Sequence, residues 1–171
     1  MNNTTQSTPK SAHSATTIRG MRADEPDAFA LLQQLDERLC ALYPPIHRHI
    51  LSVQQLLEPS VSLVVAYVEG HSVGCGAVRR MPAEPAAGLP AYGEIKRMFV
   101  LPAQRGQRIA SHVIDYLENV LRSESITCAV LETGTFQPEA IRAYERAGYT
   151  QRKAFGEYID DGVSVLMHKI L

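Results

Sequence analysis

Two hydrophobic periods divide the chain into predicted helices and strands. Between Phe29 and Leu42, and again between Ile109 and Leu121, apolar residues recur every three to four positions. Such one-sided stripes predict amphipathic helices. Residues 62–69 and 72–80 are instead continuous apolar and β-branched runs separated by Gly70-His71. These runs predict a β-hairpin.

Proline and glycine indicate where several of these elements begin and end. Asp24-Glu25-Pro26 is a typical helix start, and Tyr43-Pro44-Pro45 ends the same helix. Pro138 begins another helix that runs to Ala147, with Gly148 as its C-terminal cap. Residues 81–90, rich in proline, predict a loop, and 53–57 a short helix. The remaining predicted strands are 17–21, 94–100, 127–131, 155–158 and 163–169.

The order β-α-α-β-β-β-α-β-α-β-β predicts an α/β (α+β) domain with a mixed sheet covered by helices. Inside the strand at 94–100, strict alternation fails, because Ile95 and Phe99 share one parity while Met98 and Val100 straddle it. An extra residue, a β-bulge, would restore the apolar side chains to buried positions. A bulged strand also splays from its neighbour and frees backbone groups for a ligand.

The turn between this strand and the helix from Ile109 contains Gln104-Arg105-Gly106-Gln107-Arg108. A helix that begins there directs free N–H groups and the positive end of its dipole at whatever lies over the turn. The turn therefore predicts an anion site, and a phosphate is its usual occupant. Taken alone, the same residues also fit an ordinary exposed turn.

Composition narrows the function classes further. The 171 residues fit one domain, predicted at 17–171 after a disordered, Ser- and Thr-rich tail at 1–16. A formal net charge of −1 gives no basic field for nucleic acid, and the apolar runs are too short for a membrane span. The tail has no secretory signal, which favours the cytoplasm. Cys40, Cys75 and Cys128 are interpreted as small buried residues in a reducing compartment.

Two blocks of the chain resemble the GCN5-related N-acetyltransferase (GNAT) family, and the element order is similar from residue 17 to the end. The first block, RGQRIA at 105–110, is similar to the family's acetyl-CoA signature, with Arg108 where the family prefers glycine. The second block is QPEAIRAYERAGY at 137–149. It resembles the family's N-x-x-A-x-x-x-Y-E-x-x-G-F helix, with Gln137 at the usual Asn and Tyr149 at the usual Phe. The resemblance implies a mostly antiparallel central sheet and an acetyl-CoA-dependent acyltransferase.

The resemblance also implies which residues hold acetyl-CoA as co-substrate. The pantetheine arm would pair with the bulged strand, and the pyrophosphate would lie over the turn. A cation at Arg108 suits a phosphate, but a positive φ there would be strained. The implied set is Met98, Phe99, Val100, Arg105, Gly106, Gln107, Arg108, Ile109, Ala110, Ser111, Gln137 and Ala140.

Tyr144 matches the family tyrosine that donates a proton to the departing thiolate, although its spacing also fits a core aromatic residue. The acceptor amine must lose a proton, and a carboxylate near the acetyl group would take it. Glu94 is the first candidate for this base and Glu132 the second. The amine then attacks the thioester directly, without a covalent enzyme intermediate.

The acceptor is a primary amine of a small molecule or peptide that the sequence leaves unidentified. Two histidines at 47 and 49 without a third ligand do not indicate zinc. Because they follow the first helix together with Tyr43, Tyr43 and His47 are predicted to line the acceptor pocket, and Glu132 is a further candidate for binding the acceptor. Asp160 and Asp161 would attract a cationic amine or simply form a turn. A non-catalytic acyl-CoA sensor and a plain interaction domain are the alternative functions. Edge strands near the C-terminus offer a way to pair two copies in a homodimer.

Overall fold

The computed structural model describes residues 15–44, 49–159 and 162–171. The predicted disordered tail lies outside these residues except for its last two, Ala15 and Thr16, and the predictions for His47, Asp160 and Asp161 lie outside them as well. The strands and helices follow one another in this order: β1 (Thr16–Gly20), α1 (Pro26–Leu42), α2 (Val53–Leu56), β2 (Val61–Val68), β3 (His71–Met81), β4 (Tyr92–Val100), α3 (Ile109–Ser123), β5 (Cys128–Gly134), α4 (Pro138–Arg146), β6 (Thr150–Gln151) and β7 (Ser164–Ile170).

The described strands form one seven-stranded sheet in the order β1-β2-β3-β4-β5-β7-β6. Among the described strands, only the β4–β5 neighbours run parallel, and the other pairings are antiparallel. The prediction of a mixed, mostly antiparallel sheet flanked by helices is therefore confirmed. The β4–β5 connection passes through α3, as a parallel pair requires.

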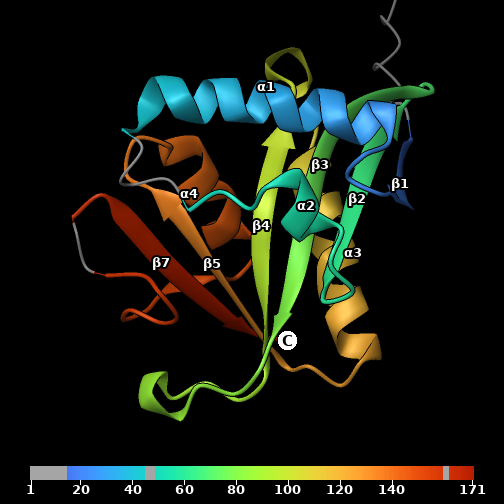
Figure 1. The fold of residues 1–171 in the computed structure, drawn as a ribbon. Helices are drawn as coiled ribbons and strands as arrows, with labels where there is room; N and C mark the ends of the chain where they lie inside the picture. The colour runs from blue at the N-terminus through green and yellow to red at the C-terminus, as the bar shows by residue number, and fades with distance from the viewer. Residues whose placement is uncertain (1–14, 45–48, 160–161) are drawn as a thin grey trace, which may run out of the picture.

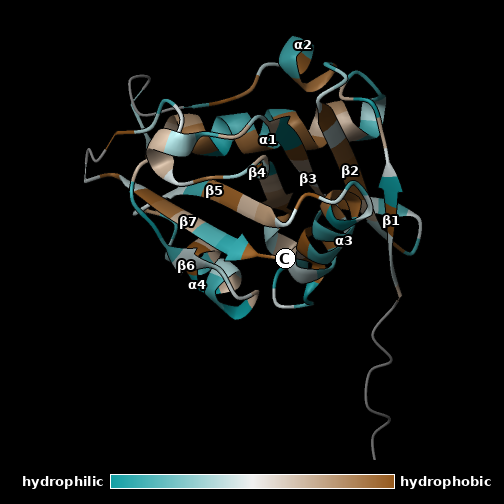
Figure 2. Cartoon of the chain, turned by 90° about the horizontal axis from the view of Figure 1, so that it is seen from below, coloured by the Kyte–Doolittle hydropathy of each residue, from teal (hydrophilic) through white to brown (hydrophobic). Residues whose placement is uncertain are grey.

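Alternation along β2 separates two cores on opposite faces of the sheet (Figure 1). Val64 and Ala66 belong to the core that also contains α3 residues and Tyr144 of α4. Figure 1 shows α1 and α3 on opposite faces of the sheet. Leu63 and Val65 pack with α1 on the other face. A strand buried on both faces reads as a continuous apolar run. Figure 2 accordingly colours the central strands largely as hydrophobic and the edge strand β1 as hydrophilic.

Most predicted boundaries agree with the structure to within three residues. The hairpin turn lies at Glu69 and Gly70, which both have positive φ. After α4, Gly148 has φ 90°, and the Tyr149 amide donates to the Tyr144 carbonyl at 3.0 Å, a C-terminal cap as predicted. The predicted loop at 81–90 contains one short 3₁₀ turn, Pro85–Ala87.

The predicted strand at 155–158 is wrong. The strand that pairs with β7 is β6, five residues earlier. Gly156 instead has φ 57°, and its amide donates to the Glu84 carboxylate. Phe155 and Tyr158 are buried and pack edge-on, with ring centroids 5.0 Å apart. Loop packing thus satisfies the apolar pattern that indicated a strand.

The cysteine prediction holds for two of the three residues. Cys75 and Cys128 are buried, whereas Cys40 is exposed on α1, and none of the three forms a disulfide within the described residues. The interpretation of Cys40 as a buried residue is wrong, because it lies on the solvent side of an amphipathic helix. Within the described residues, no helix combines the length and apolar character needed to cross a membrane.

Candidate active site

β4 and β5 pair only at their beginnings, and this separation creates the site. Their ladder covers Gly93–Ile95 and Ala129–Leu131, although both strands continue beyond it. The two strands then diverge, as Figure 1 shows. Two adjoining cavities lie where they separate, a large groove of about 480 Å³ and a small cavity of about 100 Å³. Volumes of a few hundred Å³ are typical of ligand sites.

A bulge in β4 confirms the predicted break in alternation. Opposite it, Cys75 pairs with Phe99 but Ala77 pairs with Lys96, so β4 holds one extra residue. Ile95 packs in the α3 core and Phe99 in the α1 core, although they are four positions apart in the strand. Without an inserted residue, both would face the same side.

Arg97 occupies the bulge and ties it to α1. Its φ is 57°, and its side chain is only 3% exposed. The guanidinium forms an ion pair with Asp36 and donates to the Leu32 carbonyl at 3.4 Å. The Cys75 thiol donates to the Arg97 carbonyl at 3.5 Å. Contacts with α1 and with β3 therefore hold the strained backbone of Arg97 in place.

The large groove collects nearly all residues predicted to bind acetyl-CoA. Eleven of the twelve border it: Met98, Phe99, Val100, Arg105, Gly106, Arg108, Ile109, Ala110, Ser111, Gln137 and Ala140. Gln107 does not, and its amide group donates to the Gln104 side chain at 2.9 Å. Arg38, Glu139 and Arg146 also border the groove, and sequence reasoning had not singled them out.

The start of α3 provides the anion-binding geometry expected of the turn. Gly106 has φ 81°, and Arg108, the N-cap residue, has φ 62° and ψ 14°. No side chain caps the helix, so the first amides of α3 remain available at the groove. Arg108 thus adopts the left-handed conformation that favours glycine, at a cost of about 1 kcal/mol or more.

Tyr144 is the point where the two cavities meet. It borders both of them, together with Leu35, Met98, Gln137 and Ala140. The ring is 7% exposed and packs edge-on to Tyr149, with centroids 5.9 Å apart. Burial raises the pKa of the Tyr144 phenol, and the charge of Glu132 raises it further. The phenol is therefore protonated at neutral pH and able to donate.

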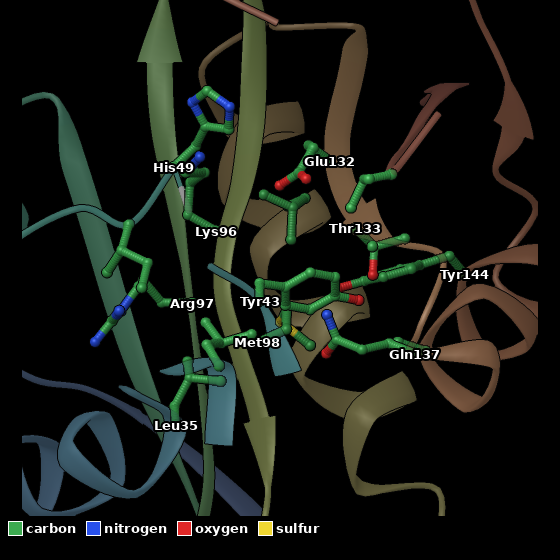
Figure 3. A pocket seen from close by; sticks show the side chains of 16 residues that line it. Leu35, Tyr43, His49, Lys96, Arg97, Met98, Glu132, Thr133, Gln137 and Tyr144 are labelled. Atoms are coloured by element: carbon green, nitrogen blue, oxygen red, sulfur yellow. The ribbon is translucent and has the colours of Figure 1, made fainter. Parts of the chain in front are cut away.

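The small cavity receives side chains from α1, β4, β5 and α4 (Figure 3). Glu132 of β5 borders it, and the Ser164 hydroxyl donates to its carboxylate at 3.0 Å. Burial raises the pKa of Glu132, and this effect outweighs the lowering by Ser164, Lys96 and His49. A carboxylate with a raised pKa is a better proton acceptor than an ordinary one.

Glu94 occupies a different position from Glu132, since it borders neither cavity. It is 6% exposed and lies 3.2 Å from the Lys96 ammonium. The Tyr158 hydroxyl donates to Glu94 and accepts from Lys96 at 2.6 Å. Only Lys96 of this buried network borders the small cavity. Glu94 is thus separated from the cavity by its own ion-pair partner.

Tyr43, the candidate acceptor-pocket residue, borders the small cavity. Its hydroxyl accepts a hydrogen bond from the Phe136 amide at 3.1 Å, and burial raises its pKa. The ring lies against the backbone of Gly134, where a Cβ atom would be 2.0 Å from the Tyr43 oxygen. The end of β5 and the end of α1 therefore position each other.

Lys96 and Arg97 are further site residues that sequence reasoning missed. Both border the small cavity and both are less than 10% exposed. Two consecutive cations inside a strand whose other residues after Glu94 are apolar were the available signal, because charged residues are seldom buried without a partner. In the part of the chain that the structure describes, no group of three or more His, Cys, Asp or Glu side chains could hold a metal ion.

Comparison with known proteins gives a consistent result. The family model described as "Acetyltransferase (GNAT) family" matches residues 27–149. An IAA acetyltransferase of Azospirillum brasilense is 38% identical over 141 residues, which are 82% of this chain and 88% of the relative. The aminoalkylphosphonate N-acetyltransferase of Salmonella typhimurium is 32% identical over 96 residues, which are 56% of this chain and 61% of that protein.

A solved structure agrees with these relatives. A Klebsiella pneumoniae protein assigned to the acyl-CoA N-acyltransferases superposes with a TM-score of 0.72 and 30% identity. The match covers 91% of this chain and 97% of the other. The similarity therefore spans the sheet, both helical layers and the site between β4 and β5.

Proposed function

Because the chain belongs to the GNAT family of acetyltransferases, we propose that it moves the acetyl group of acetyl-CoA to a primary amine by direct attack. The observation that carries this proposal is the junction of the two cavities at Tyr144. One cavity has the size and cationic turn for a nucleotide thioester, and the other has the half-buried carboxylate of Glu132 for an amine. The acetyl group would lie where they meet.

The residues of the large groove fit acetyl-CoA. The start of α3 presents free amides for a pyrophosphate, and Ala110 is small enough for a close approach. Beyond Ile95, β4 has no backbone pairing with β5, so Met98–Val100 can pair with the amide groups of an extended pantetheine. Acetyl-CoA supplies an activated thioester carbonyl, and the chain supplies position and proton transfer.

We assign the base to Glu132 in preference to Glu94. Glu132 borders the small cavity, whereas Glu94 is held by Lys96 and Tyr158 behind it. Glu132 would accept the proton of the attacking amine as the C–N bond forms. Tyr144 would donate its proton to the sulfur as the C–S bond breaks. Glu132 thus acts on the incoming amine, and Tyr144 acts on the departing thiolate.

The assignment predicts how the rate depends on pH. An acceptor carboxylate must be deprotonated, so kcat/KM should fall as pH drops through the raised pKa of Glu132. Glu132→Gln should lower kcat/KM by about 100-fold and remove this acidic limb. Glu94→Gln is the matched control variant, and the acidic limb of its kcat/KM profile should persist. Loss of the limb in Glu94→Gln but not in Glu132→Gln would make Glu94 the base.

The overall proposal is tested by thiol release from acetyl-CoA over a panel of amines, with mass detection of the product. Aminoalkylphosphonates belong in the panel, because a relative's name identifies them as its acceptors. The small cavity, at about 100 Å³, supports a slender amine-bearing end as the part that enters. Acetyl-CoA binding in calorimetry without turnover on any amine would support the alternative, a non-catalytic sensor. Absence of binding would exclude both.

A further inference from the structure

The large groove has a concentrated positive charge that the chain as a whole lacks. Arg38, Arg105, Arg108 and Arg146 border it, and Glu139 is the one carboxylate among its bordering residues. The groove thus has a formal charge of +3, whereas the chain has −1. Arg38 belongs to α1 and Arg146 to α4, so the charge is not confined to the turn before α3.

Glu139 connects the two sides of this groove. Its Oε1 atom accepts a hydrogen bond from the Arg38 guanidinium at 2.6 Å and lies 3.6 Å from a guanidinium nitrogen of Arg105. Arg38 lies near the end of α1, Arg105 in the turn, and Glu139 in the first turn of α4. One carboxylate oxygen therefore holds two guanidinium groups from two separate elements.

We infer that Glu139 is an internal counter-ion that competes with the phosphates of the donor for Arg38 and Arg105. The inference rests on the proposed use of acetyl-CoA. A phosphate carries more charge and more acceptor oxygens than a carboxylate, and guanidinium groups bind it bidentately. The donor's phosphates would therefore displace Glu139 from at least one of its partners.

The three side chains are 33–43% exposed, so the exchange requires no unfolding. Exposed ion pairs contribute little to folding, since water screens them and the long side chains lose entropy. The same screening makes the Arg38–Glu139 pair easy to open. Glu139 competes with the donor, so its charge lowers the affinity of the groove for phosphates and leaves its affinity for the uncharged pantetheine arm unchanged.

The test compares Glu139→Gln with wild type in equilibrium binding of acetyl-CoA and of S-acetylpantetheine, which has no phosphate. Glu139→Gln should bind acetyl-CoA about three- to fivefold more tightly at low salt, the scale of one exposed ion pair. Its affinity for S-acetylpantetheine should not change. Arg38→Gln should weaken acetyl-CoA binding by a similar factor. Glu145→Gln, on the same helix but outside the groove, is the control and should leave both affinities unchanged.

The outcomes separate this inference from the proposed function. Wild-type binding of acetyl-CoA with unchanged affinity in Glu139→Gln, or an equal gain for S-acetylpantetheine, would overturn the inference alone. Tighter binding by Arg38→Gln would overturn it as well. If the wild-type chain bound no acetyl-CoA, the inference and the proposed function would both fall. Thermal melting of each variant establishes that the chain is folded.

Discussion

Tyr144 shows how one residue can belong to the core and to the site at once. Its ring packs among α3-face residues, while its edge borders both cavities. The core-aromatic interpretation and the functional one are therefore compatible. Burial raises the pKa of the phenol, which makes it a weak acid but keeps its proton available for a thiolate.

Tyr144→Phe removes only the hydroxyl and should reduce kcat by about 100-fold, the usual range for a general acid. The affinity for acetyl-CoA should change little, because the ring remains. Steady-state kinetics and calorimetry provide the two measurements. Tyr149→Phe is the control, since it removes a neighbouring buried hydroxyl that borders neither cavity. An unchanged kcat in Tyr144→Phe, with chemistry rate-limiting, would exclude the acid role.

At the scale of the elements, the end of β5 and the end of α1 contact each other beside the small cavity. Gly134, the last residue of β5, leaves space that the Tyr43 ring occupies. The Tyr43 hydroxyl in turn accepts from the Phe136 amide, which lies between β5 and α4. The acceptor side of the site thus depends on one close approach between two elements about 90 residues apart.

Gly134→Ala should push Tyr43 aside and break its hydrogen bond to the Phe136 amide. KM for the acceptor should rise about fivefold, the equivalent of one hydrogen bond of about 1 kcal/mol. Acetyl-CoA affinity should stay the same, because neither Gly134 nor Tyr43 borders the large groove. Gly20→Ala is the matched control, with no atom within 4 Å of the added methyl group. A shift in acetyl-CoA affinity alone would contradict this assignment.

At the scale of the whole molecule, an ion-pair network around the buried Glu118 joins α3 to β7. Glu118 of α3 is 1% exposed and accepts from Lys169 of β7 at 2.7 and 2.8 Å. Arg122 donates to the same carboxylate at 3.0 Å. A buried carboxylate is tolerated only with such partners. The network anchors α3 to β7, across the strand pair that opens into the site.

Glu118→Gln removes the charge that balances Lys169 and Arg122. The free energy of unfolding should fall by about 2 kcal/mol, because Lys169, whose side chain is 21% exposed, loses its counter-charge. Chemical denaturation measures this change, and kcat at a permissive temperature should remain near wild type. Glu124→Gln breaks the more exposed pair with Arg80 and should cost under about 1 kcal/mol. Equal losses in the two variants would contradict the importance of burial.

The sequence by itself determined the features that depend on neighbours along the chain. Hydrophobic period, proline and glycine predicted the helices, the hairpin and the bulge in β4. The turn before the helix start predicted the anion site, and the resemblance to the family indicated Tyr144. These features are local, because backbone conformation and side-chain direction follow from residues a few positions apart. The sequence also indicated that Arg108 would be strained if its φ were positive, but only the structure shows that φ is 62°.

Only the tertiary structure decided what depends on residues far apart in the chain. It placed the strand beside β7 at Thr150–Gln151, because Phe155 and Tyr158 are buried as a loop. It set Glu94 behind Lys96 and Glu132 at the cavity, although both are glutamates on adjacent strands. It also brought Arg38 to Glu139 across 101 positions. Packing fixes such contacts, and no pattern of spacing encodes them.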